Sequence, residues 1–198
     1  MYTYIQKKIH KNVPDFDIPN LMLNHTVLQV NKKNFRIIEI EFYVNSEEHK
    51  DEYTHGSDEQ HTYGFWYFHK YKNGTYKSGT YKGLDLTLGN KDTSYGILIR
   101  SIQDLSTNEI TEGCCNCVNK ILSEYKINTI SEFTNDTTLL CTKNDRDFVI
   151  NDFNIDEYKV YDGKRVGLSD KYPEFRDKPY RFAIMINKLK KHVKYFNK

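Results

Sequence analysis

The segment RIIEIEFYVNSEEHKDEYTHG, residues 36–56, decides how this chain folds. Apolar and polar side chains alternate through its first half, which is typical of a β-strand with one packed face. A dense run of Glu, Asp, His and Ser over residues 45–62 then predicts a loop. The packed face of the strand holds Ile38, Ile40 and Phe42, and the opposite face holds Glu39, Glu41 and Tyr43.

The polar face of this strand has two interpretations. Alternating glutamates in isolation usually form a solvated strand face. Here, however, Tyr43 shares the face with Glu41, and His49 and His55 follow within a dozen residues. A partly desolvated carboxylate beside aromatic rings suits general-base chemistry, because the rings stack on a flat group while the carboxylate activates water.

The composition predicts one folded α/β domain. The chain has 198 residues, of which 38% are hydrophobic and 14% aromatic, so it is too rich in aromatic residues for a disordered chain. The net charge of +2 results from 29 Lys and Arg against 27 Asp and Glu. Any nucleic-acid surface must therefore come from charge gathered on one part of the molecule.

Local patterns predict the order of the elements. Residues 21–30 suggest the end of a helix or a first strand, and residues 84–89 and 95–102 predict two further strands. Helices are expected over 113–127 and 129–134, short strands over 147–153 and 158–163, and a turn-rich loop with a final strand over 165–186. The segment 188–198 spaces Leu189, Val193 and Phe196 among lysines at helical intervals. We expect an N-terminal arm over 1–17, the domain over 18–187 and a basic tail over 188–198.

Residues 63–83 interleave aromatic and basic side chains and repeat NGTYK as SGTYK. The period of five predicts a glycine-punctuated hairpin or loop, because an odd period turns alternate copies to opposite faces of a strand. A solvated hairpin explains the pattern, and so does nucleic-acid binding, in which ammonium groups contact phosphates and rings stack on bases. The side chains concerned are Lys70, Lys72, Lys77 and Lys82 with Tyr67, Tyr71, Tyr76 and Tyr81.

The cysteines and histidines do not predict a metal site. The cluster CCNC at 114–117 has no matching Cys or His pair at ligand spacing, so we interpret its cysteines as small buried hydrophobic residues of a helix. Spacings of six and eight between His49, His55, His61 and His69 fit no helical ligand pair.

Five motifs in order resemble the alkyladenine (3-methyladenine) DNA glycosylase family over residues 18–187. The strand IIEIEFY matches V-E-x-E-A-Y, and the segment SEEHKDEYTHG matches the acidic segment and histidine that follow it. GTYKSGTYKG matches G-T-x-Y…Y-G in length, and GILIRSI matches V-L-I-R-A. RVGLSDKYPEFRDKPYRFAI matches R-V-G…W…K-P-x-R-F-Y-V, and EGCCNCVNKILSEYKI matches the helix G-P-x-x-L-C-x-A-L-x-I.

The resemblance implies a fold, an activity and a set of site residues. The fold is a single domain in which helices flank a curved antiparallel sheet, with no metal and no cofactor. Glu41 matches the general base that activates water against the anomeric carbon, and Arg100 matches an arginine near that water. Tyr43 and His55 match rings that sandwich a flipped base.

Two positions depart from the family pattern. Gly79 stands where the family has a second pocket tyrosine, and Lys82 stands where it has an intercalating tyrosine; the pocket asparagine falls near Gly89. A local shift would let Tyr81 or Tyr76 take over these roles. Without such a shift, the base pocket is larger and the wedge is a cation.

The sequence thus predicts a monomeric DNA glycosylase of base excision repair. It would flip a modified purine from damaged or mispaired duplex DNA, contact the DNA through Tyr76, Lys77 and Lys82, and hydrolyse the N-glycosidic bond. A non-catalytic nucleic-acid-binding module on the same fold is the alternative, and a hydrolase of RNA or free nucleosides is a third. With no apolar run of membrane-spanning length and no signal-peptide core, we expect a soluble intracellular protein, in nucleus or cytoplasm.

Overall fold

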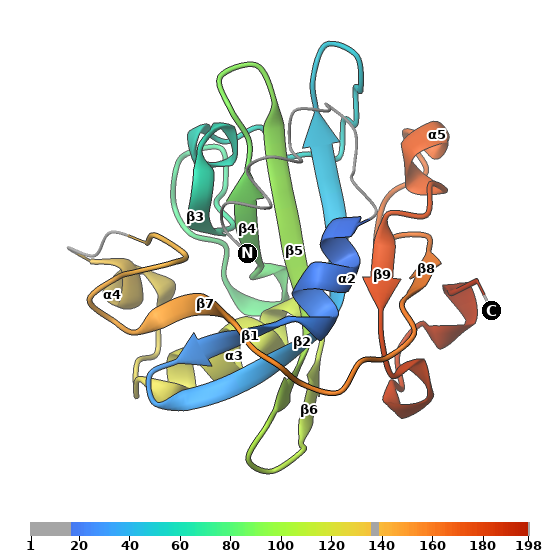
Figure 1. Ribbon diagram of the computed structural model, residues 1–198. Coiled ribbons are helices and arrows are strands. Elements are labelled where there is room, and N and C mark those ends of the chain that lie inside the picture. Colours follow the sequence, from blue (N-terminus) through green and yellow to red (C-terminus); the bar gives the residue numbers. More distant parts are fainter. Residues whose placement is uncertain (1–16, 136–138, 198) are drawn as a thin grey trace.

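The computed structural model describes residues 17–135 and 139–197. Within these residues, nine antiparallel strands form one sheet that curls into a half-barrel, with few helices (Figure 1). This confirms a mixed α/β single domain with a curved antiparallel sheet. The order across the sheet is β3 (Tyr63–Phe68), β4 (Leu84–Leu88), β5 (Ser94–Asp104), β2 (Lys33–Asn45), β1 (Thr26–Val30) and β7 (Phe148–Asp152).

Three short strands extend the sheet at its sides. β6 (Ile110–Glu112) pairs with β5, while β9 (Arg181–Ala183) pairs with both β2 and β8 (Tyr161–Gly163). The strands predicted over 84–89, 95–102, 147–153 and 158–163 are confirmed as β4, β5, β7 and β8. The segment 21–30 contains both predicted alternatives, because a helix ends at Asn24 and β1 begins at Thr26.

The strand predicted in the first half of residues 36–56 is β2, the longest strand of the sheet. It pairs with β5 along most of its length, with β1 at its start and with β9 at residues 39–41. Phe42 and Ile40 are fully buried, as the alternation predicts. The polar face is covered too, since Glu39 is 4% exposed and Glu41 is 0% exposed. The interpretation of these glutamates as a solvated face is therefore wrong.

An irregularity in the pairing of β2 with β5 lies beside these glutamates. The register shifts on both sides of Glu39, so that Glu39 pairs with Ser101 and Ile40 pairs with Ile99. Arg100 lies between those two partners and has no Cα partner of its own in this ladder. β-bulges of this kind re-aim side chains. Here the irregularity lets Arg100 reach both carboxylates.

Two helices cover opposite faces of the sheet. In Figure 1, α2 (Asp17–Asn24) lies in front of the sheet and α3 (Cys114–Glu124) lies behind it. α3 and α4 (Ile130–Thr134) confirm the helices predicted over 113–127 and 129–134, and α5 (Pro173–Arg176) is a single turn. The 3-10 turns are η1 (Asp58–His61), η2 (Gly79–Tyr81), η3 (Ile186–Lys188) and η4 (Val193–Tyr195). No helix within 17–135 or 139–197 has the length and apolarity needed to cross a bilayer.

Two predictions at the ends of the chain need correction. The predicted helix over 188–198 is absent from the described part of this segment, because His192 has a left-handed backbone with φ of 56° and separates two 3-10 turns. Leu189 and Phe196 nevertheless pack into the core. Most of the predicted arm, residues 1–16, lies outside the described residues, and Asp17 already belongs to α2.

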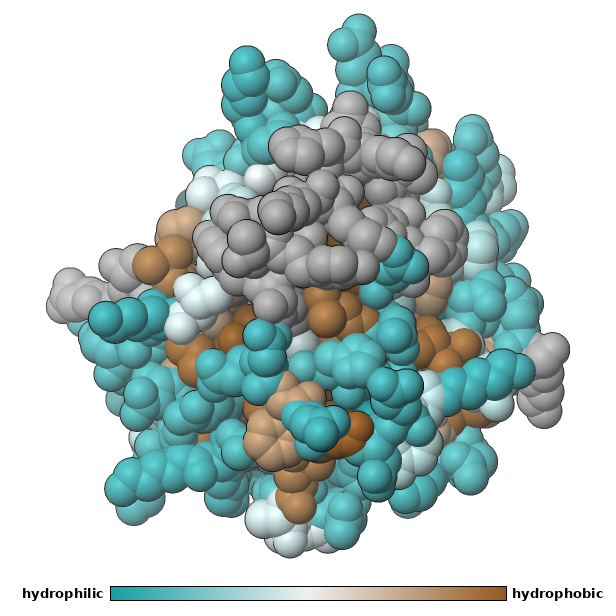
Figure 2. All heavy atoms as spheres, in the orientation of Figure 1, coloured by the Kyte–Doolittle hydropathy of each residue, from teal (hydrophilic) through white to brown (hydrophobic). Residues whose placement is uncertain are grey.

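The surface of the described residues is mainly hydrophilic on the face seen in Figure 2, with small apolar areas between charged side chains. Of the cysteines predicted to be buried, Cys117 is buried in the core, whereas Cys114 and Cys115 are half-buried. The interpretation of CCNC as buried hydrophobic residues is therefore correct for one of its three cysteines.

The curl of the sheet brings β3 against β7. Trp66 on β3 stacks on Phe148 of β7 with ring centroids 4.8 Å apart, and its indole Nε1 donates to the Phe148 carbonyl over 2.9 Å. A bridge between Phe65 and Leu140 adds backbone pairing at the same place. These contacts hold the two sides of the half-barrel together.

We expect Trp66→Phe to lower the free energy of unfolding by about 1–3 kcal/mol, because it removes a buried hydrogen bond and part of the ring stack. Chemical denaturation followed by circular dichroism measures this loss. Phe153, which is 41% exposed, provides the control, since Phe153→Ala should change stability by no more than about 0.5 kcal/mol. Equal stability of Trp66→Phe and wild type would contradict the role given to Trp66.

Candidate active site

Glu41 is a buried carboxylate on β2 that accepts three hydrogen bonds. Its Oε2 accepts hydrogen bonds from the Tyr43 hydroxyl at 2.9 Å and from Arg100 Nη1 at 3.1 Å. Its Oε1 accepts the backbone N–H of Val166 at 3.0 Å. An ionised carboxylate has about four lone-pair sites, so three donors leave it one further acceptor position.

Glu39 forms the other half of a network that we call the carboxylate cluster: Glu39, Glu41, Arg100 and Arg181. Glu39 Oε1 accepts from Arg100 Nε at 3.0 Å and from Arg181 Nε at 2.7 Å, and Ser101 donates to its other oxygen. Burial alone would raise the pKa of Glu39, but the two guanidinium groups lower it overall. Burial would lower the pKa of Arg100, but Glu41, Cys114 and Glu39 raise it overall. Within the cluster, Glu39 and Arg100 therefore each favour their charged forms.

Tyr43 is positioned by a second buried ion pair. Arg165 forms a two-point contact with Asp51, at 2.6 Å and 3.1 Å, and both side chains are 0% exposed. The Arg165 guanidinium also lies 4.5 Å from the centre of the Tyr43 ring. Burial and the neighbouring Glu41 raise the pKa of the Tyr43 hydroxyl well above its usual value, so it stays protonated and donates to Glu41.

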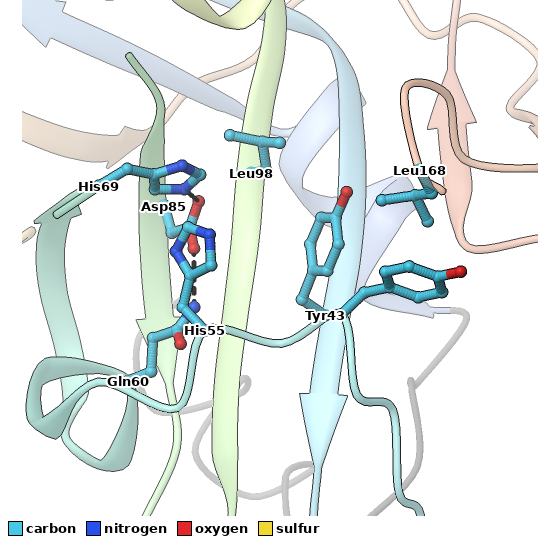
Figure 3. Close-up of a pocket in the computed structure, with 8 residues that line it drawn as sticks. Tyr43, His55, Gln60, His69, Asp85, Leu98 and Leu168 are labelled. Atoms are coloured by element: carbon cyan, nitrogen blue, oxygen red, sulfur yellow. Dashed lines mark hydrogen bonds and ion pairs between the residues drawn. The ribbon is translucent and has the colours of Figure 1, made fainter. Parts of the chain in front are cut away.

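A cavity of about 100 Å³ opens beside Tyr43. Figure 3 shows His55, His69 and Asp85 on one side of it and Tyr43 and Leu168 on the other, with Leu98 of β5 between them. Glu41 does not itself line the cavity but reaches its wall through the Tyr43 hydroxyl. The residues that line the cavity are Tyr43, Tyr53, His55, Gln60, His69, Asp85, Leu98 and Leu168.

His55 forms one wall of the cavity as a neutral ring. Lys77 Nζ lies 3.1 Å from its Nε2 and, as a donor, leaves that nitrogen to accept. Its Nδ1 lies 3.3 Å from the Tyr67 hydroxyl, and its ring meets His69 edge-on at 4.4 Å. Although part of His55 is exposed, burial of the ring and the adjacent His69 lower its pKa to about 4.

The polar side chains of the cavity other than His55 were not predicted from the sequence. Asp85 on β4 is 1% exposed and contacts His69 Nε2 at 2.7 Å and Gln60 Nε2 at 2.9 Å. Asp85 is one polar residue in the alternating pattern of β4, and Gln60 lies in the short turn η1. No local sequence pattern therefore identifies either residue as part of a cavity. The one available signal is Gly96, which pairs with Tyr43 on the neighbouring strand and lacks a side chain where these groups meet.

The structure divides the residues expected to bind DNA into two groups. Lys77 contacts His55, and Tyr76 packs at the edge of the core under Lys70. The bridge between Lys70 and Tyr76 confirms a hairpin around Gly74, whereas residues 63–68 of the predicted hairpin or loop form the strand β3. Gly79, Tyr81 and Lys82 do not line the cavity.

Gly79, Tyr81 and Lys82 lie together at η2. Gly79 has φ of +56° and a Cβ placed on it would meet no atom within 4 Å, so it leaves open space there. Lys82 Nζ donates to Asn119 Oδ1 on α3 at 2.6 Å. Tyr81 is 71% exposed, the largest exposed fraction among the exposed large hydrophobic side chains of the described residues.

A metal centre is not among the features of this site. Across residues 17–135 and 139–197, no three His, Cys, Asp or Glu side chains gather in a way that would hold a metal ion. The chemistry available in the described cavity is that of carboxylates, imidazoles and phenols.

We expect the His55 ring to titrate near pH 4 rather than near 6.5, because burial and His69 disfavour its charged form. The unfolded chain binds this proton from about pH 6.5, so this residue contributes stability above that pH that is lost as the pH falls towards 4. Ring NMR signals followed from pH 3.5 to 8 measure the titration. The spectrum of His55→Gln assigns the His55 signals. A His55 midpoint near 6.5 would contradict the packing of its ring.

A viral protein is similar to most of this chain. No known family model matches the chain. An uncharacterized protein of Acanthamoeba polyphaga mimivirus is 42% identical over 189 residues, and the match covers 88% of this chain and 88% of the relative. A match of this length extends well beyond any single motif.

Proposed function

This chain belongs to the family of the mimivirus protein, and we propose that it is a DNA glycosylase. In this proposal it acts as a monomer, flips a modified purine out of DNA and hydrolyses the N-glycosidic bond of that base. Support comes from the resemblance of its motifs to the alkyladenine DNA glycosylases and from the geometry around Glu41.

The single observation that carries the proposal is the placement of Glu41. It is 0% exposed, held by three donors, and joined through Tyr43 to a small cavity with ring walls. A carboxylate fixed in this way is preorganised for proton transfer and for stabilising positive charge. The walls formed by Tyr43 and His55 suit a flat aromatic group.

The proposed reaction uses Glu41 as general base. The bond from the anomeric carbon to the purine nitrogen breaks, and the bonding electrons leave with the base. Water attacks the anomeric carbon and gives a proton to the remaining acceptor position of Glu41. The carboxylate also stabilises the oxocarbenium-like sugar before the new C–O bond is complete. Arg100 positions Glu41 through the hydrogen bond from its Nη1.

Two grooves beside the cavity offer cations to the phosphates of DNA. One groove shares Tyr53 and His55 with the cavity and is lined by Lys70, Lys72 and Lys77 together with Glu52, Asp58 and Glu59. The other shares Leu168 with the cavity and is lined by Lys164, Arg176 and Asp177. Lys70 is paired with Glu59, and Lys164 and Arg176 are paired with Asp177, so phosphate contacts in this proposal fall to Lys72 and Lys77.

A non-catalytic nucleic-acid-binding module remains the second candidate. The observation that favours it is the absence of Gly79, Tyr81 and Lys82 from the cavity wall, which leaves fewer rings to hold a flipped base. Base release from DNA separates the two candidates, because the module would bind DNA and release nothing.

We expect Glu41→Gln to reduce base release by about 10²–10⁴-fold while leaving DNA affinity nearly unchanged, because the amide cannot accept the proton from water. Single-turnover release from duplexes carrying single modified purines measures the rate, and fluorescence anisotropy measures affinity. Glu39→Gln is the matched control, since Glu39 lies one pleat further from Tyr43. It should mainly lower thermal stability, because Arg181 loses its buried charge partner. Equal loss of base release per folded molecule in both variants would overturn the assignment of Glu41.

We further expect Tyr81 to be the side chain that fills the gap left by a flipped base. An inserted ring helps to offset the few kcal/mol of unstacking and unpairing. Tyr81 is exposed and free to insert, whereas Lys82 is bound to Asn119. Tyr81→Ala should slow release from paired duplex more than from a mismatch, and Lys82→Ala should change the two equally. The reverse pattern would place the wedge on Lys82, where the sequence resemblance put it.

A further inference from the structure

The cavity contains an acidic group that the proposed hydrolysis does not use. Asp85 is 1% exposed, lines the cavity opposite Tyr43, and lies 2.7 Å from His69 Nε2. Its Oδ1 faces His69 Nε2 and its Oδ2 accepts from Gln60 Nε2. An ionised carboxylate has about four lone-pair sites, so the contacts of the described residues leave acceptor positions on this group.

The neighbours of Asp85 fix it as an acceptor. Gln60 Oε1 already accepts the backbone N–H of Gly56 at 2.9 Å and the hydroxyl of Ser94 at 3.3 Å. The amide NH₂ of Gln60 must therefore point to Asp85 rather than its oxygen. Gln60 is 1% exposed, which leaves it little freedom to turn over.

Two glycines provide the room for this arrangement. A Cβ on Gly96 would lie 2.5 Å from both Asp85 Oδ2 and Gln60 Nε2, and a Cβ on Gly83 would lie 2.4 Å from His69 Nδ1. A side chain at Gly96 would therefore require Asp85 and Gln60 to move, and a side chain at Gly83 would require His69 to move. The backbone is thus shaped around the Asp85 group, as expected for a built binding position rather than for an incidental buried acid.

We propose that Asp85 selects the flipped base by accepting a hydrogen bond from an N–H on the edge of that base. The cavity then prefers purines that present an amino group or a ring N–H to Asp85, and it disfavours purines whose corresponding edge has acceptors alone. This inference rests on the proposed function, since it names the substrate class of the same site.

The expected preference for one base over another follows from a free-energy cost. This cost arises when an acceptor atom of the base lies against the Asp85 carboxylate, which is also an acceptor. A buried polar group left without its partner loses much more than a solvated one, so sites built around a hydrogen bond discriminate strongly against analogues that lack it. We expect a preference of about ten- to a hundredfold.

Three duplexes that differ in one modified base test the proposal. 7-Methylguanine is cationic and has N–H donors on its pairing edge, hypoxanthine is neutral with a ring N–H, and 1,N⁶-ethenoadenine is neutral with acceptors alone. Wild type should release the first two faster than the third. Asp85→Asn should reduce that ratio by at least tenfold for both 7-methylguanine and hypoxanthine. A change confined to the cationic base would show a charge effect alone and would overturn the hydrogen-bond proposal.

Matched variants separate selection from folding. Asp104→Asn changes a buried carboxylate of β5 whose partner is Ser106, and it should leave the ratio unchanged. His69→Gln keeps an N–H for Asp85 and should preserve the ratio, whereas His69→Leu should reduce it. If Asp85→Asn does not fold by circular dichroism, the comparison of the two His69 variants decides. An unchanged ratio of release rates in a folded Asp85→Asn variant would overturn the proposal. If Asp85→Asn does not fold, an unchanged ratio in His69→Leu would overturn it.

Binding of free bases separates this inference from the proposed function. If wild type releases none of the three bases, the glycosylase proposal fails. The role of Asp85 is then tested by calorimetry with free 7-methylguanine and free 1,N⁶-ethenoadenine. Tighter binding of 7-methylguanine that Asp85→Asn abolishes would support Asp85 as a base-selecting group without catalysis. Equal binding of the two bases, or binding of neither, would overturn it.

Discussion

The bridge that Arg100 makes between Glu39 and Glu41 is the interaction on which the rest of this structure depends. Two carboxylates two residues apart on one strand face would repel each other if buried without cations. Arg100 reaches both of them because the β2–β5 ladder is irregular beside it. Arg181 on β9 supplies the second guanidinium for Glu39. The position of β9 along β2 is thus tied to the charge balance of the cluster.

This charge balance also explains why the site is rigid. Removing one member of a buried ion network costs about 3–5 kcal/mol, because the remaining charge stays buried without a partner. The strands that carry the cluster are therefore fixed relative to one another before any ligand arrives. For Glu41 this means a defined direction for its remaining lone pair, and preorganisation of that kind is what electrostatic catalysis requires.

Sequence patterns predicted β2, β4, β5, β7 and β8 and the helices α3 and α4 because alternation and helical spacing are local properties, whereas β3 and β6 were not predicted as strands. β2, β5 and α3 illustrate this, and the proximity of Glu41 to Tyr43 follows from strand geometry alone. The cavity could not be predicted in the same way. Asp85 and Gln60 meet through the pairing of β4 with β5 and the packing of η1, and neither contact leaves a mark in the local sequence. The predicted tail helix is absent for a related reason. Contacts of the tail with Gly163 of β8 and Arg181 of β9 accompany a left-handed backbone at His192, and the spacing of apolar residues does not encode these contacts.

The two acidic groups of the site differ in their electrostatic surroundings. Glu41 accepts from the Arg100 guanidinium, whereas Asp85 contacts the imidazole of His69 and the amide of Gln60. Lys77 is directed to His55, which burial keeps neutral. Glu41 is therefore in direct contact with a guanidinium group, whereas Lys77 acts on Asp85 at longer range. If the proposed function is correct, a base in the cavity would have Glu41 towards its sugar and Asp85 towards its outer edge. The acceptor oxygens of Asp85 would then favour bases that present N–H groups at that edge.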